Sequence, residues 1–226
     1  MKKSKYPGLL LFLMLVGSLA SGQTSDFGIR FGSEFSKKLT KKIEFQLEEE
    51  LRFNQNVTTF DRSLLTLGGS YTLNKTFKAG VFYTWIYMNN QSDHYNESRH
   101  RFGGWVQAAH KVNRFKFTLR EKFQNTYLNE ELGDFSYNPK MYLRSKLEVN
   151  YDIRKFPLNP YLSAEVYRQL NNPFGNSFSK WKYTVGTEYN LNKKLSFDLY
   201  FLIDNEINVK NPVRSSVIGA TMKFKL

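Results

Sequence analysis

The sequence contains no cysteine. Disulfides, cysteine metal ligands, cysteine nucleophiles and a lipid anchor attached to cysteine are therefore excluded. Beyond its N-terminal segment the chain also lacks a long apolar run, whereas a membrane-spanning helix needs about 20 consecutive apolar residues. If this chain enters a membrane, it does so without a transmembrane helix.

The N-terminal segment has the features of an export signal. It begins with three basic residues, Lys2, Lys3 and Lys5. An apolar run over residues 9–20 follows, and the small residues Ala20 and Gly22, at positions −3 and −1, favour cleavage before Gln23. The expected organisation is a signal peptide, residues 1–22, and one exported domain, residues 23–226.

Acidic residues are few relative to basic ones. The chain has 33 Lys and Arg against 20 Asp and Glu, a net charge of +13, and loss of the three signal lysines leaves +10. Because this charge is spread along the whole exported chain rather than gathered in one patch, nucleic acid is not an expected partner.

Aromatic residues are abundant, at 16% of the chain, although the mean hydropathy is negative. This combination suits strands whose alternate residues face lipid and water. Residues 77–87 show the pattern, and a second alternating run, 99–109, follows after a polar loop. A soluble sheet also alternates, but strands of this length with aromatic rings beside the loop are typical of a membrane barrel wall.

The same alternation recurs along the mature chain. We expect strands over residues 27–36, 43–53, 65–73, 77–87, 99–109, 115–124, 141–151, 162–167, 181–189, 195–204 and 218–226. The predicted fold class is all-β, a transmembrane antiparallel up-and-down β-barrel of about 10–12 strands. Because bacterial single-chain barrels have an even number of strands, either the segment 27–36 is not a regular wall strand or one further strand remains unidentified.

The expected turns are of two kinds. Short turns are rich in Lys and Arg, and longer loops, such as 54–61, 89–98 and 128–139, are rich in acid and amide groups. Short turns face the periplasm in such barrels and long loops face outside. The basic turns could lie against anionic headgroups, or Lys and Asn could simply be suitable turn residues.

The positions expected to face the lumen carry many charges. They form the predicted lumen charge cluster: Glu48, Glu50, Arg52, Arg99, Arg101, Lys116, Arg120, Lys122, Arg144, Lys146, Glu148, Glu165, Glu188 and Asp198. Acids occur early and late in the chain and bases in the middle, so an acidic wall would face a basic one. Such charges either line a conducting pore or interlock as salt bridges that plug the lumen.

Arg99 and Arg101 share a face with Trp105 and could hold a carboxylate or sugar acid. The alternative is that both arginines pair with lumen acids, which are Glu48, Glu50 and Glu188. A second group is a predicted aromatic belt near the longer loops: Tyr83, Trp85, Tyr87, Tyr127, Trp181 and Tyr183. Such rings anchor a barrel at the membrane interface, and stacking on sugars is the alternative.

Catalytic and metal signatures are lacking. An enzyme site would need a Ser–His or Asp–His pair, and the candidates are Asp93–His94 and Ser98 with His100. No G-x-S-x-G, H-E-x-x-H or P-loop pattern accompanies them. We therefore expect no catalytic residue, no metal site and no cofactor.

Four short segments resemble a known family. They are Asp26-Phe27-Gly28, Leu39-Thr40-Lys41-Lys42-Ile43, Glu48-Glu49-Glu50-Leu51-Arg52-Phe53 and Arg99-His100-Arg101-Phe102. In these the chain is similar to the DUF2490 group of outer-membrane proteins of Gram-negative bacteria. The resemblance implies a barrel in a membrane, and it implies no reaction or substrate.

The expected function is that of a passive pore or a solute-binding barrel in the bacterial cell outer membrane. A plugged structural or adhesion barrel that acts through its outer loops is the alternative, and an outer-membrane hydrolase comes third. The expected partners are membrane lipid, lipopolysaccharide and a small ionic solute.

Overall fold

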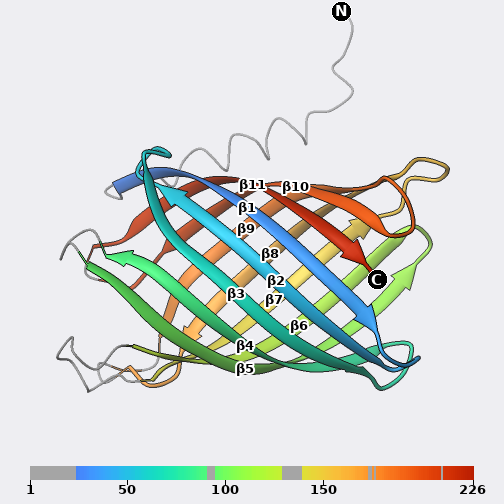
Figure 1. The fold of residues 1–226 in the computed structure, drawn as a ribbon, viewed down its shortest axis with the longest axis horizontal. Helices are drawn as coiled ribbons and strands as arrows, with labels where there is room; N and C mark the ends of the chain where they lie inside the picture. The colour runs from blue at the N-terminus through green and yellow to red at the C-terminus, as the bar shows by residue number, and fades with distance from the viewer. Residues whose placement is uncertain (1–23, 91–94, 129–138, 173–174, 176, 210) are drawn as a thin grey trace, which may run out of the picture.

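The computed structural model describes residues 24–90, 95–128, 139–172, 175, 177–209 and 211–226, and these form eleven β-strands in a closed barrel (Figure 1). The strands are β1 (Thr24–Lys38), β2 (Ile43–Asn54), β3 (Thr59–Thr72), β4 (Phe77–Asn90), β5 (Tyr95–Val112), β6 (Phe115–Tyr127), β7 (Lys140–Tyr151), β8 (Leu158–Gln169), β9 (Phe178–Asn190), β10 (Leu195–Glu206) and β11 (Val213–Lys225). Nothing within these residues is a helix long and apolar enough to cross a membrane. The predicted signal peptide, residues 1–22, lies outside the described residues.

Alternation along each strand separates an apolar exterior from a charged interior. Val81, Leu162 and Leu199 point outward and are 67%, 62% and 55% exposed. Large apolar residues are exposed in the same way around the barrel, far beyond the few hundred Å² of apolar patch usual on a soluble monomer. Closure pairs every strand with two neighbours, so no backbone edge is left without hydrogen bonds. The predicted all-β barrel is confirmed, and its exterior suits lipid.

The barrel closes through a parallel pair. Successive strands are antiparallel neighbours, whereas β1 and β11 run in the same direction, from Thr24 opposite Val213 to Ser36 opposite Lys225. The segment expected at 27–36 is therefore a full wall strand, and the described residues contain eleven strands, not ten or twelve. The expectation of an even number is wrong, because a parallel seam lets an odd number close.

The turns fall at two ends of the barrel, which we call the short-turn end and the long-loop end. The short-turn end carries residues 39–42, 73–76, 113–114, 152–157 and 191–194. Asn74 and Asn192 fix two of these turns, because the side-chain oxygen of each accepts hydrogen bonds from the backbone N–H groups two and three residues later. At the long-loop end β2 leads to β3, β4 to β5, β6 to β7, β8 to β9 and β10 to β11. Two loops expected there, 54–61 and 89–98, are shorter than predicted because the flanking strands continue further.

Glycines face aromatic rings across neighbouring strands inside the barrel. The directly opposed pairs are Phe82 with Gly103, Trp105 with Gly80, Tyr161 with Gly186 and Tyr200 with Gly219. Each ring lies over its glycine, so that a Cβ on Gly80 would come within 2.6 Å of the Trp105 ring. Such aromatic cover of glycine fixes strand register in curved sheets.

Two carboxylates break the apolar pattern of the exterior. Glu49 and Glu121 occupy outward positions near the middle of β2 and β6. The Ser145 hydroxyl donates a hydrogen bond of 2.7 Å to Glu121, and Ser33 lies opposite Glu49 on β1. Ionisable groups on a lipid-facing surface are costly, and a serine on the neighbouring strand accompanies each of these two.

We predict that Val81→Arg destabilises the barrel in lipid by about 2–4 kcal/mol, because it places a charge on the outer face near mid-wall. Urea unfolding in lipid vesicles measures the change, and Val81→Leu, which keeps the position apolar, is the matched control. Equal stability of the arginine and leucine variants would show that Val81 does not face lipid.

We also predict that Gly219→Ala lowers stability by about 1–3 kcal/mol, because the added methyl group collides with the Tyr200 ring. Gly69→Ala is the control, since a Cβ there meets nothing within 4 Å. That substitution should be neutral or slightly stabilising. If both variants unfold at the same urea concentration, the ring does not hold the strand register.

Candidate functional site

The lumen contains one large cavity of about 920 Å³. At its mouth it is lined by the turn residues Arg114 and Asp152, and at its deep end by Arg52, Leu64 and Arg101. The described residues of the turns at the long-loop end do not line it. The cavity therefore occupies the half of the barrel near the short-turn end and opens there.

Beyond the deep end of the cavity, inward-pointing side chains from five strands fill the lumen. We call this group the closing layer. The layer consists of Ile86, Gln124, Tyr167, Asp204 and Val217, all buried, with Ile86 only 1% exposed. They come from β4, β6, β8, β10 and β11, so the layer draws on strands around most of the ring.

Tyr167 ties this layer to the deep wall of the cavity. The Arg144 guanidinium lies 4.4 Å from the centre of its ring, and the Lys182 ammonium lies 5.1 Å from it. Arg144 also donates hydrogen bonds to Glu165 at 2.9 Å and to Gln124 at 3.0 Å. A buried aromatic ring held between two cations, with their acids beside them, makes a rigid packed layer.

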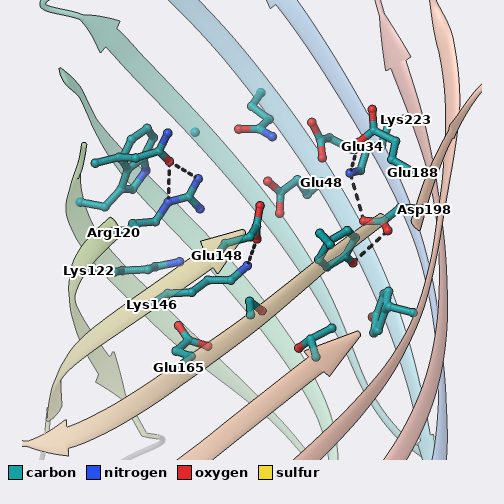
Figure 2. Close-up of a pocket in the computed structure, with 18 of the residues that line it drawn as sticks. Glu34, Glu48, Arg120, Lys122, Lys146, Glu148, Glu165, Glu188, Asp198 and Lys223 are labelled. Carbon is teal, nitrogen blue, oxygen red and sulfur yellow. Dashed lines mark hydrogen bonds and ion pairs between the residues drawn. The ribbon is translucent and has the colours of Figure 1, made fainter. Parts of the chain in front are cut away.

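Most lumen charges are neutralised by a neighbour. The ion pairs among the cavity-lining residues are Arg52–Glu50 at 2.5 Å, Lys78–Glu44 at 2.7 Å, Lys111–Asp152 at 3.3 Å, Arg144–Glu165 at 2.7 Å, Lys146–Glu148 at 2.6 Å, and Lys223 with Glu188 at 2.9 Å and Asp198 at 3.0 Å. The Tyr161 hydroxyl adds a hydrogen bond of 2.9 Å to Asp198 (Figure 2). Arg144–Glu165 and Lys223–Asp198 join adjacent strands, whereas the other contacts lie within one strand or reach across an intervening one.

Eight charged residues that line the cavity have no such neighbour among the described residues: the cations Arg30, Arg101, Arg114, Lys116, Arg120 and Lys122, and the acids Glu34 and Glu48. Arg120 and Lys122 lie on β6, whereas Glu34 and Glu48 lie on β1 and β2. None of the four forms an ion pair with a described residue. Figure 2 shows Arg120 and Lys122 on one side of the cavity and the two acids on the other. The cavity therefore separates these two cations from these two acids.

The predicted lumen charge cluster lies almost entirely on this cavity. Every member lines it except Arg99, which pairs with the buried Glu97 nearer the long-loop end. The partners expected for Arg99 and Arg101 are wrong, since the Arg101 Nε donates to the Thr126 hydroxyl at 3.0 Å instead. The reason is the length of β5, whose 18 residues carry its arginines beyond the acids of the 12-residue β2.

Several important lumen residues were not singled out from the sequence. Tyr167, Lys182 and Lys223 all occupy inward positions of their strands, so strict alternation contained the signal. What the sequence could not reveal is which of these positions end up at the same depth.

The predicted aromatic belt lies on the outer face towards the long-loop end. Tyr83 contacts Phe102 with ring centres 5.0 Å apart, and Trp181 stacks on Tyr183 at 6.5 Å. The remaining members, Trp85, Tyr87 and Tyr127, are also exposed on this face. Their placement suits interfacial anchoring.

The expected catalytic candidates do not form a Ser–His pair. His100 Nδ1 shares a hydrogen bond of 2.8 Å with the Tyr83 hydroxyl, and the Ser98 hydroxyl accepts one of 3.3 Å from Trp85 Nε1. Asp93 and His94 lie outside the described residues. Across the part of the chain that the structure describes, no three His, Asp or Glu side chains are grouped to hold a metal ion.

We predict that Arg144→Ala destabilises the barrel by about 2–5 kcal/mol, because it leaves Glu165 unpaired in a poorly hydrated part of the lumen. Lys111→Ala removes the exposed pair with Asp152 and should cost under about 1 kcal/mol. Urea unfolding of both variants tests this, and similar costs would mean that the deep pair is as well hydrated as the one at the mouth.

Comparison with known proteins gives a family and a similar solved structure. The family model DUF2490, described as a protein of unknown function, matches residues 27–214. Among solved structures the chain is similar to the translocator domain of autotransporter NalP from Neisseria meningitidis, with 11% identity, 79% of this chain and 73% of that chain covered, and a TM-score of 0.37. The sequence has no match among curated proteins.

Proposed function

We propose that this chain, which belongs to the DUF2490 family, is an outer-membrane barrel that binds a small ionic solute in a cavity open at one end. The family carries no known activity, so the proposal rests on the geometry of the lumen. The observation that carries it is the closing layer around Tyr167, whose side chains are buried where a conducting pore would need water.

The placement in a membrane follows from the exterior. Apolar residues cover the outer face along the whole barrel wall, and a ring of basic residues surrounds the short-turn end: Lys41, Lys42, Lys75, Arg154, Lys155, Lys193 and Lys194. Short turns face the periplasm in barrels of this kind. In that orientation the cavity opens towards the periplasm, and its basic rim attracts anionic groups.

A closed lumen favours binding over conduction. The cavity volume lies within the range of about 300–1,000 Å³ that is usual for small-molecule sites. Its wall presents charged groups without partners, which are available to a ligand, while the deep pairs are already satisfied. We assign it no reaction.

We predict that the refolded barrel gives no stable single-channel steps in a planar bilayer, whereas Tyr167→Ala does, because removal of the ring opens the closing layer. Tyr183→Ala, which removes an outer-face ring from the neighbouring strand, is the control and should remain closed. Regular open steps from the unaltered protein would contradict the proposal and favour a pore.

A further inference from the structure

The cationic side of the cavity is preorganised. Arg120 donates two hydrogen bonds to the Gln107 side-chain oxygen, at 2.6 and 3.0 Å, and its guanidinium lies 4.9 Å from the centre of the Trp105 ring. Lys122 lies 3.7 Å from the centre of the Phe82 ring. Neutral partners fix both side chains in position and leave their charge uncompensated, so they remain available to a carboxylate.

The acidic side consists of two neighbouring carboxylates. Glu34 and Glu48 occupy directly opposed positions of β1 and β2. Like charges in such a pair destabilise a sheet. Lys223 occupies the position opposite Glu34 on β11, but its ammonium pairs with Glu188 and Asp198, and no described cation forms an ion pair with Glu34 or Glu48. The cations that interact with Glu48 at longer range are Lys122 and Arg120, on the far side of the cavity.

The two sides cannot approach each other. β1 and β2 lie across the ring from β6, and each strand is hydrogen-bonded to both of its neighbours. The charges therefore stay apart, with the cavity between them, unless a ligand joins them. A simple anion would leave Glu34 and Glu48 uncompensated, and a simple cation would leave Arg120 and Lys122 uncompensated.

We propose that the cavity binds a zwitterionic peptide, with its carboxylate on Arg120 and Lys122 and its ammonium group on Glu34 and Glu48. A volume of about 920 Å³ exceeds the needs of a single amino acid and suits a short peptide. Arg30, Arg101, Arg114 and Lys116 also line the cavity without an ion pair, so the ligand carries at least as many anionic as cationic groups.

This inference rests on the proposed solute-binding function, and calorimetry with three probes tests it. The full chain, refolded in detergent micelles, is titrated with trialanine, with N-acetyl-trialanine, which lacks the ammonium group, and with trialanine amide, which lacks the carboxylate. Trialanine should bind about tenfold or more tightly than either blocked peptide, because each block removes a charge-assisted contact.

Variants assign the two ends of the peptide. Glu34→Gln with Glu48→Gln should weaken trialanine to the level of N-acetyl-trialanine and leave the N-acetyl peptide unaffected. Arg120→Gln with Lys122→Gln should have the corresponding effect on the carboxylate end. Lys111→Gln is the control, because Lys111 already pairs with Asp152 at the mouth. Circular dichroism verifies that each variant folds.

The possible outcomes distinguish failure of the peptide inference from failure of the proposed solute-binding function. Equal binding of trialanine and N-acetyl-trialanine would overturn the zwitterion and leave an anion-binding cavity. Failure of all three probes to bind a barrel that remains closed in the bilayer would overturn the peptide but not the closed lumen. Open channel steps from the same preparation would overturn both.

Discussion

The structure depends on closure of the backbone hydrogen-bond ring. In a hydrocarbon environment an unpaired N–H or C=O group costs several kcal/mol, so a sheet that faces lipid must have no edge. Here β1 and β11 remove the last edge by pairing in parallel over most of their length. Once the ring is closed, the separation of any two walls is set by the backbone, and side chains in the lumen must accommodate it.

Closure also explains why the alternation is so regular and where it fails. Each strand has one neighbour on either side, and its two faces meet lipid and the lumen. Whether a residue faces lipid or the lumen is therefore decided by its odd or even position along the strand. Glu121 and Glu49 are the exceptions, and the serine on the strand beside each is their polar neighbour. Inside, the opposed glycines and rings, such as Gly80 with Trp105, pack closely across neighbouring strands.

The sequence was sufficient for the barrel, the family and the facing of the charged residues, because these follow from period-2 alternation and short motifs. It was not sufficient to predict how far along the lumen each side chain lies. Whether Arg99 reaches Glu50 depends on how far β5 extends beyond β2, which is a property of register and stagger around the ring. The parallel seam was unpredictable for the same reason, since nothing local in the segment 27–36 states which strand lies on its other side.

Depth in turn separates two kinds of lumen charge. Near the closing layer water is scarce, and acids such as Glu165 and Asp204 have a cation within 3.5 Å. An unpaired charge there would strongly destabilise the folded barrel. In the open half water can solvate a charge, so Arg120 and Glu48 persist without ion-pair partners on opposite walls. The ion pairs near the closing layer are therefore explained by the stability of the fold alone. The charges without ion pairs in the open half are not explained in this way, and the proposed zwitterionic ligand would account for their placement.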